Sequence, residues 1–339
     1  MPKVTLNIST SPHLVKGLSV DTIMKHVLYA LIPAAAYSVY AFGLNALLVL
    51  VTATLSAVLT EHVLCNLSKK ESTITDYSAV ITGLLLGMTL PPNFPIWMTF
   101  LGGVIAIGMG KFIFGGLGYN VFNPALVGRA VLQAAFPVAI TTWYPVFNPD
   151  RFTAISSSIL TIPFMTPQVD GVTGATPLSA FKFDHVQTSA YDLAMGYCSG
   201  SSGEISAVIL LIGGIYLAWR NMLNWRIPVS ILLSVFLLSG IMHLVNTSSY
   251  PSPLFMLFSG GLMLGAIFMA TDMVASPITS MGVWVYGAII GLLVVVIRLW
   301  GGLPEGVMYA ILLANAISPH IDNLIQPRVY GTNNKNKRS

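Results

Sequence analysis

Ten apolar stretches run through this chain of 339 residues, and their length is the feature that most limits its fold. A helix that crosses the hydrocarbon core of a bilayer needs about 20 apolar residues, or fewer where a broken helix is shielded by protein. Hydrophobic residues make up 55% of the chain and charged residues only 8%, which excludes a soluble globular protein. The sequence therefore predicts an all-α integral membrane protein with spans at about residues 23–42, 44–65, 77–90, 96–110, 125–140, 205–219, 227–245, 254–271, 281–300 and 306–321.

The ten spans fall into two groups of five on either side of a long polar interval. The motif Gly-Leu-Leu-Leu-Gly at residues 83–87 recurs as Gly-Leu-Met-Leu-Gly at residues 261–265, and each copy runs into a proline-bearing break. An odd number of spans reverses the orientation of the second group, so we expect two inverted five-helix repeats. The alternative is that this glycine spacing reflects only close helix packing. The predicted organisation is a cytoplasmic segment (1–22), a first membrane repeat (23–140), a loop (141–204), a second repeat (205–322) and a basic tail (323–339).

The distribution of basic residues predicts the orientation, because Lys and Arg concentrate in cytoplasmic loops. With the N-terminus in the cytoplasm, only Arg151, Lys182 and Arg298 fall on the opposite side. Both termini are then cytoplasmic, and loop 141–204 faces the periplasm or the cell exterior. The residues on or near the cytoplasmic side are Lys3, Lys16, Lys25, Lys69, Lys70, Lys111, Arg129, Arg220, Arg226, Arg328, Lys335, Lys337 and Arg338.

Several partner and cofactor classes are excluded by composition. The net charge of +4 follows from topology, since no basic stripe with interleaved aromatic residues indicates a nucleic-acid partner. Cys65 and Cys198 are too few and too far apart for an iron-sulfur or zinc site within the chain, so any cluster belongs to a partner. The polar N-terminus carries no cleavable signal-peptide pattern, and the first span is expected to remain as an anchor.

The segment Asp-Gly-Val-Thr-Gly-Ala-Thr-Pro-Leu-Ser at residues 170–179 stands out within the polar interval. On composition alone, Thr176 caps a helix whose first residue is Pro177. The run Thr-Gly-Ala-Thr, with an acidic residue before it and Pro-Leu after it, also resembles the flavinylation motif of the RnfD/NqrB family, membrane subunits of ion-pumping electron-transfer complexes. The resemblance implies FMN joined through its phosphate to the hydroxyl of Thr176, with Thr173, Gly174, Ala175 and Pro177 as motif neighbours.

Attachment of FMN at this motif would need outside help. A free threonine hydroxyl is a poor nucleophile, and no neighbouring His or Cys activates it. We therefore expect a flavin transferase to act on an accessible loop with small neighbours. Further along, Ser201 and Glu204 have capping-box spacing ahead of the sixth span, although the same amides would also suit the FMN phosphate.

A glycine-rich run between the fourth and fifth spans, residues 115–129, raises the question of a dinucleotide site. No strand precedes it and no acidic residue follows at the right distance, which excludes a Rossmann motif. Its Asn-Pro-Ala-Leu segment resembles that of the family, where a second, non-covalent flavin (riboflavin) is expected. Asn120 and Asn123 would then bond the ring edge; equally, they would bond backbone carbonyls freed at a helix break.

The counterpart in the second half is the run from Phe268 to Pro277. An acid at the end of an apolar span is costly to bury, so Asp272 is a candidate for bonding the second flavin or a cation, with Phe268 against the ring. The family usually has Pro where Met273 stands. The alternative is an interfacial Asp272 facing water, and solvation near the interface likewise explains Glu61.

The resemblance covers nearly the whole chain and is closer to RnfD of Rnf complexes than to NqrB of the sodium-pumping NADH:quinone reductase, which has a longer N-terminal extension. It implies a urea-transporter-like fold in a bacterial inner membrane. The chain would carry electrons between ferredoxin and NAD with coupled Na⁺ or H⁺ movement, without a catalytic residue or metal of its own. Its partners would be iron-sulfur subunits and a second flavinylated subunit. Competing hypotheses are an NqrB-like component and a solute channel or transporter. The matching segments are Ser11-Pro12-His13, residues 123–126, the Thr176 motif, residues 259–261, 270–272 and 304–310.

Overall fold

The computed structural model describes residues 19–69, 73–163, 165, 174–204, 206–247 and 249–326, and these residues contain helices and loops but no β-strand. The expectations placed on residues 1–18 and on the tail beyond residue 326 lie outside the described residues. The first half holds α1 (Val20–Phe42), α2 (Leu44–Leu67), η1 (Ile74–Asp76), α3 (Ser78–Thr89), α4 (Ile96–Ile107), the π-helical η2 (Gly108–Phe112), α5 (Pro124–Ala135) and α6 (Pro137–Ile140).

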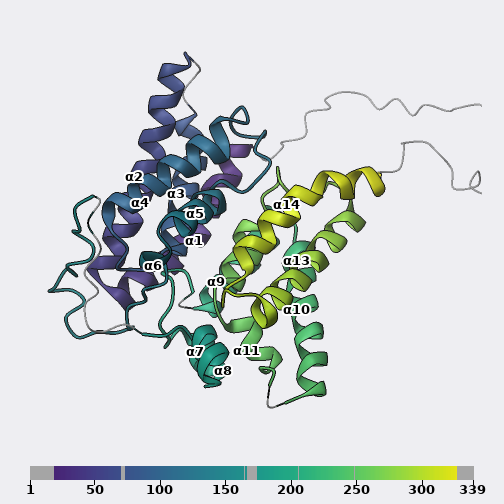
Figure 1. The fold of residues 1–339 in the computed structure, drawn as a ribbon. Coiled ribbons are helices and arrows are strands. Elements are labelled where there is room, and N and C mark those ends of the chain that lie inside the picture. Colours follow the sequence, from purple (N-terminus) through teal and green to yellow (C-terminus); the bar gives the residue numbers. More distant parts are fainter. Residues whose placement is uncertain are drawn as a thin grey trace, which may run out of the picture.

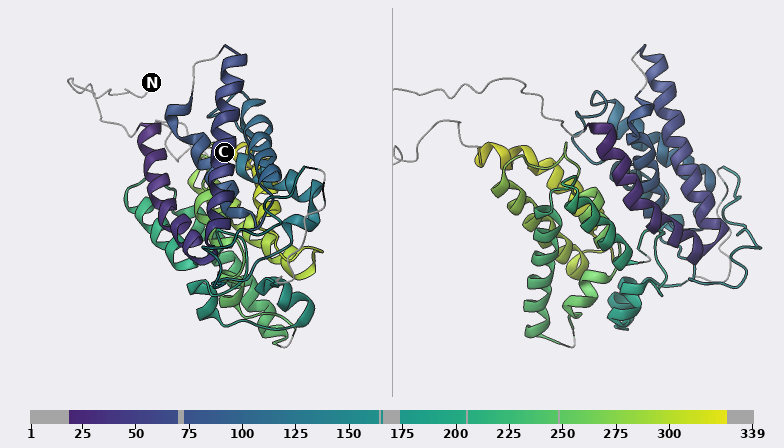
Figure 2. Two further views of the ribbon diagram at one scale, coloured as in Figure 1. Left: turned by 90° about the vertical axis from the view of Figure 1, so that its left-hand side faces the viewer. Right: turned by 180° about the vertical axis from the view of Figure 1, so that it is seen from behind.

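The polar interval contributes two short helices, α7 (Pro177–Asp184) and α8 (Ala190–Met195). The second half holds α9 (Ala207–Trp219), α10 (Arg226–Val245), α11 (Pro253–Phe258), α12 (Leu262–Leu264), the π-helical η3 (Gly265–Met269), α13 (Ser280–Trp300) and α14 (Val307–Leu324). The helices of the first half gather on one side of the molecule and those of the second half on the other, with α7 and α8 at one end (Figure 1). Helix α1 begins and α2 ends at the opposite end of the bundle (Figure 2).

Most of the predicted spans coincide with helices to within a few residues, but the fifth and the eighth are not continuous helices. The fifth is interrupted at Phe136, between α5 and α6. In the eighth, residues 254–271, the chain leaves the helix at Ser259 and Gly260, where Gly260 has the left-handed φ of +64°. The carbonyls freed by this break are bonded by Arg298, whose guanidinium lies 2.6 Å from the oxygen of Met256 and 2.8 Å from that of Ser259. Backbone at membrane depth must be satisfied within the protein, and a buried arginine does so here.

Three helices of the described chain are long and apolar enough to cross a membrane on length and composition: α2, α10 and α13. Helix α2 has the surface expected of a lipid-facing span. Its exposed apolar side chains recur at every fourth position, which lines them up along one face of the helix. They are Leu47, Val51, Leu55, Leu59 and Val63.

The opposite face of α2 packs closely on α3. A side chain at Gly83 would meet the backbone of Ala53 and Thr54, and one at Gly87 would meet Leu50. Small residues let two membrane helices approach in this way. The glycine spacing at residues 83–87 therefore serves close packing of α3 on α2, which is compatible with both interpretations of that motif. The second copy has other contacts, since Gly265 packs on Val307 of α14.

Candidate functional site

Thr176 is the N-cap of α7, as its position before Pro177 predicted. Its hydroxyl accepts a hydrogen bond from the backbone N–H of Ser179 at 3.2 Å and donates to the hydroxyl of Ser179 at 3.0 Å. Pro177 occupies the first helical turn, where its missing N–H costs nothing. The side chain is 7% exposed, so the accessible loop that the sequence suggested is a buried one in this conformation.

A cavity of about 700 Å³ adjoins this threonine. Three residues of the predicted motif, Gly174, Ala175 and Thr176, line it, whereas Thr173 lies outside the described residues. The remainder of the wall comes from α7 and from distant parts of the chain. It consists of Arg129, Gln133, Ile140, Thr141, Thr142, Trp143, Leu178, Ser179, Phe183, Glu204, Leu303, Pro304 and Glu305.

Gly174 allows the motif to lie close to the neighbouring loop segments. Its N–H donates to the carbonyl of Trp143 at 3.0 Å. A Cβ at this position would lie 2.5 Å from the hydroxyl oxygen of Ser199, closer than side chains pack. Gly174, two residues before Thr176, therefore allows the loop to lie close to both Trp143 and Ser199.

Charged side chains from both halves of the bundle meet at the cavity wall. Arg129 of α5 donates to Glu305, in the loop before α14, at 2.6 Å. The other carboxylate oxygen of Glu305 accepts from the N–H of Gly261 at 2.7 Å, at the break between α11 and α12. The Nε of Arg129 is buried without a hydrogen-bond partner. Arg129 was assigned to the cytoplasmic side from sequence, but the structure places it inside the bundle in an ion pair.

Glu204 is the second acid at this wall, and its segment corrects the capping-box prediction. Helix α9 starts at Ala207, and its N-cap is Ser206, whose side chain accepts from the N–H of Ile209. The segment before it runs into the bundle, where the N–H groups of Ser202 and Gly203 bond the carbonyls of Leu90 and Met88 at the end of α3. Glu204 thereby reaches the cavity from the inside.

The two loop carboxyls, Glu204 and Glu305, differ in protonation. Burial raises the pKa of Glu204 above its ordinary value, and the neighbouring Glu305 raises it further. Burial acts in the same direction on Glu305, but Arg129 and hydrogen bonds from Glu204 and the Gly261 backbone hold the pKa of Glu305 below its ordinary range. The folded protein therefore favours the neutral form of Glu204 and the charged form of Glu305.

A second cavity, of about 350 Å³, brings together all four residues predicted to contact the second flavin. Asn120, Asn123, Phe268 and Asp272 line it, although the first two and the last two lie in different halves of the chain. The remaining wall is mostly apolar. It includes Val20, Ile23, Met24, Val27, Ile81, Leu85, Leu117, Leu217, Met222, Leu223, Ile267, Met273 and Val274.

The asparagines of this cavity also have structural partners. The side-chain oxygen of Asn123 caps α5 through the N–H of Ala125 at 3.0 Å, and its amide donates to the carbonyl of Met269 at 3.1 Å. Asn120 donates to Asp272 at 2.9 Å. Asn123 thus makes the hydrogen bond to a backbone carbonyl that was the alternative to a flavin contact. Asp272 is half-buried and held between Asn120 and the N–H of Val274 rather than facing water freely.

One buried ion pair was not expected from the sequence. Solvation near the interface was expected for Glu61, but this residue is 2% exposed and forms an ion pair with Lys111 of η2 at 2.7 Å. Lys111, expected on or near the cytoplasmic side, is likewise buried. A glutamate and a lysine in separate spans give no local signal of pairing, because only the packing of α2 on η2 brings them together.

Comparison with known proteins adds a family-level finding. A family model described as the NQR2, RnfD, RnfE family matches residues 7–331. A Clostridium ljungdahlii protein, named as the D component of a proton-translocating ferredoxin:NAD(+) oxidoreductase complex, is 42% identical over 340 residues, which cover 97% of each chain. The D component of the Na(+)-translocating complex of Acetobacterium woodii is 40% identical over 335 residues, 98% of this chain and 97% of the relative. The D component of the ion-translocating oxidoreductase complex of Actinobacillus succinogenes is 36% identical over 352 residues, covering 97% and 99%.

Proposed function

Because the chain belongs to the NQR2, RnfD, RnfE family, we propose that it is the RnfD-type membrane component of an ion-translocating ferredoxin:NAD⁺ oxidoreductase complex. The likeness to relatives of this name extends over nearly the full length of both chains. One relative is named for proton translocation and another for Na⁺, so the proposal covers either ion. The chain would act with iron-sulfur subunits and a second flavinylated subunit.

The observation that carries the cofactor assignment is the cavity at Thr176. We propose that FMN is joined through its phosphate to this hydroxyl, in a space of about 700 Å³, within the range of about 300–1,000 Å³ usual for ligand pockets. The esterified oxygen of Thr176 would still accept the hydrogen bond from the N–H of Ser179, so the cap of α7 would be kept. The start of a helix favours the negative charge of a phosphodiester.

The groups facing this cavity suit an anionic aromatic ligand. Arg129 offers a buried Nε without a partner, and Trp143 and Phe183 offer aromatic surface. Glu204, whose pKa burial raises, also lies at the wall. FMN bound here would supply the electron-transfer chemistry that these side chains lack. Because Thr176 is buried, a flavin transferase would act before α7 packs against the bundle.

The second cavity is proposed to hold riboflavin without a covalent bond. Its apolar wall and the polar edge formed by Asn120, Asn123 and Asp272 match the usual composition of a cofactor pocket, and Phe268 lies beside that edge. The amide of Asn120 and the carboxylate of Asp272 would have to exchange their mutual bond for bonds to the ring.

We further propose that the fold consists of ten spans in two inverted repeats and resembles urea transporters. The supporting observation is that equivalent helices of the two halves make equivalent contacts. Helix α2 contacts α4 as α10 contacts α13, and α4 contacts α5 as α13 contacts α14. The broken segment from α11 to η3 would correspond to the short α3. In this arrangement the chain lies in a bacterial inner membrane with both termini cytoplasmic and Thr176 on the outer side.

Denaturing electrophoresis of protein made together with its flavin transferase tests the FMN assignment. We expect a fluorescent band and a tryptic peptide of residues 152–182 that carries the added mass of FMN, since no Lys or Arg interrupts it. Thr176→Val should give a dark band, whereas Thr153→Val, a matched control on an exposed threonine of the same peptide outside the motif, should remain fluorescent. An unmodified wild-type peptide would overturn the assignment and favour a solute channel or transporter of the same fold.

A further inference from the structure

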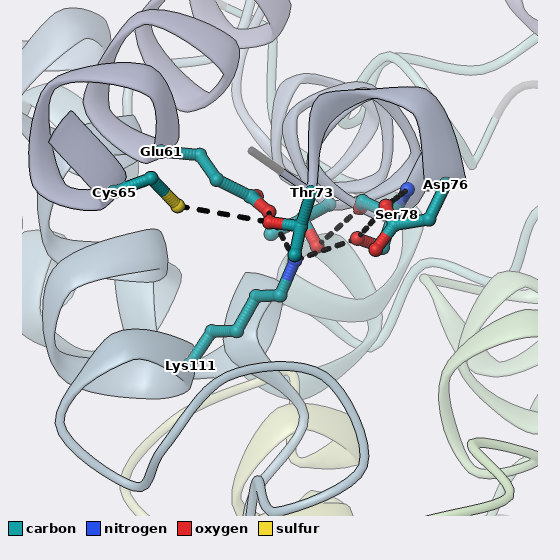
Figure 3. A network of polar contacts seen from close by, with 7 residues as sticks. Glu61, Cys65, Thr73, Asp76, Ser78 and Lys111 are labelled. Atoms are coloured by element: carbon teal, nitrogen blue, oxygen red, sulfur yellow. Dashed lines mark hydrogen bonds and ion pairs between the residues drawn. The ribbon is translucent and has the colours of Figure 1, made fainter. Parts of the chain in front are cut away.

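The ion pair between Glu61 and Lys111 is part of a larger polar cluster inside the first half of the bundle (Figure 3). The Nζ of Lys111 donates to Glu61 at 2.7 Å and to the hydroxyl of Ser78 at 2.6 Å. Ser78 in turn donates to Asp76 at 2.5 Å, and Thr73 donates to the same oxygen of Glu61 as Lys111 does. The ammonium is thus surrounded by carboxylate and hydroxyl oxygens, the ligands that small hard cations prefer.

One oxygen of this cluster lacks a partner. The Oε2 of Glu61 is buried and accepts no hydrogen bond, although the residue is only 2% exposed. In Figure 3 the carboxyl group points toward Thr73 and the ammonium of Lys111. A buried carboxylate oxygen without a donor is costly, and such exceptions usually mark a functional requirement. Ionisable groups within membrane spans are likewise usually functional.

The ammonium of Lys111 also adjoins a cavity to which it can turn. Lys111 and Ser78 both line the 350 Å³ cavity that also contains Asp272. Lys111 lies in the π-helical turn η2, an irregularity that often occurs at functional sites. Its flexible four-carbon stem allows the charge to move while the backbone stays in place. Among the described residues of the cavity wall, Lys111 is the one basic residue and Asp272 the one acidic residue.

We propose that Glu61, Asp76 and Ser78 form a monovalent-cation site that the ammonium of Lys111 occupies in the present conformation. When a negatively charged group binds in the adjacent cavity, Lys111 turns toward it, and Na⁺ or H⁺ takes the place of the ammonium at Glu61. One positive charge leaves the cluster as another enters, so the buried carboxylates remain compensated and the cavity gains a counter-charge. The cation site rests on the contacts alone, whereas its role in ion translocation rests on the proposed function.

The test uses the purified full-length chain without flavin, so it does not depend on the cofactor assignment. Lys111→Met removes the tethered cation while keeping much of the side-chain volume. We expect the thermal midpoint of this variant to rise in NaCl relative to choline chloride at equal ionic strength, because Na⁺ binds only the folded site. The wild type should show no such difference. If H⁺ is the replacing ion, the midpoint should instead rise as the pH falls.

Control variants separate a cation site from a structural ion pair. Adding Glu61→Gln to Lys111→Met should abolish the dependence of the midpoint on Na⁺ or on pH. Lys69 is an exposed lysine just after the end of α2, the helix that carries Glu61, and Lys69→Met should show neither dependence. Lys111→Gln should reproduce the effect if the methionine variant does not fold. A Lys111 variant without Na⁺ or pH dependence, or a dependence that survives Glu61→Gln, would overturn the proposal. A positive result with an unmodified Thr176 would overturn only the FMN assignment.

Discussion

The carboxyls at the Thr176 cavity illustrate how a single residue acquires its chemistry from its neighbours. Glu204 and Glu305 both lie in loops at the cavity wall, yet Arg129 and the N–H of Gly261 stabilise the charge on only one of them. Glu204 has no equally close cation, so burial and the neighbouring Glu305 raise its pKa.

The contribution of Glu204 to the stability of the protein should fall as the pH rises above the ordinary glutamate pKa of 4.5. Its pKa is raised in the folded state, so the folded chain binds more protons than the unfolded chain in that range. Glu305 has the opposite shift, and its contribution is lost only when the pH falls below its ordinary range. Glu204→Gln should flatten the decline measured as thermal midpoints between about pH 5 and pH 8. An unchanged slope would contradict a raised pKa of Glu204 in the folded state.

At the scale of elements, the helices of the first half are positioned by a corner that only glycine can make. Gly43 joins α1 to α2 with a φ of +77°, and a Cβ there would overlap the backbone carbonyl of Arg151. The N–H of Leu44 also bonds that carbonyl at 3.0 Å. The corner thereby holds the loop after α6 against the start of α2.

Gly43→Ala should destabilise the chain by at least about 1–2 kcal/mol, the usual cost of the left-handed conformation for a residue with a Cβ. The overlap with Arg151 adds to this cost. Gly302→Ala is the matched control, because a Cβ at Gly302 would meet nothing within 4 Å. Thermal unfolding in detergent measures the difference. Equal midpoints for the two variants would show that the corner relaxes at little cost.

At the scale of the whole molecule, the residues that line the two cavities lie toward different ends of the bundle. The Thr176 cavity lies at the end that carries α7 and α8, while the second cavity includes Val20 at the start of α1, at the opposite end (Figure 2). With the orientation proposed from the basic residues, one site faces outward and the other inward. Electrons passing between them would cross much of the membrane.

Cysteine labelling tests this sidedness. Phe183, at the Thr176 cavity, is 69% exposed, and Tyr119, in the loop beside the second cavity, is 72% exposed. A membrane-impermeant maleimide added to spheroplasts should label Phe183→Cys but not Tyr119→Cys, and permeabilisation should make Tyr119→Cys reactive. Parent protein with both native cysteines is the control. The reverse labelling pattern would place Thr176 in the cytoplasm.

Much of the element-level description followed from local pattern. Membrane character and the positions of most helices depend on the spacing of apolar residues along the chain, and the cap at Thr176 depends on a residue three positions away. The grouping of Asn120, Asn123, Phe268 and Asp272 in one cavity was also predicted, from resemblance rather than from pattern. The break after α11 was missed because the apolar run continues across it.

The helical structure, the membrane character and the helix start at Pro177 are all encoded in local sequence, because these properties arise from neighbours within a few residues. Which buried charges meet depends instead on how the helices pack. Arg129 and Glu305 are 176 positions apart, and Lys111 and Glu61 are 50 apart. Such pairs form because a charge inside a low-dielectric bundle must find a partner wherever packing offers one, and no local spacing encodes that choice.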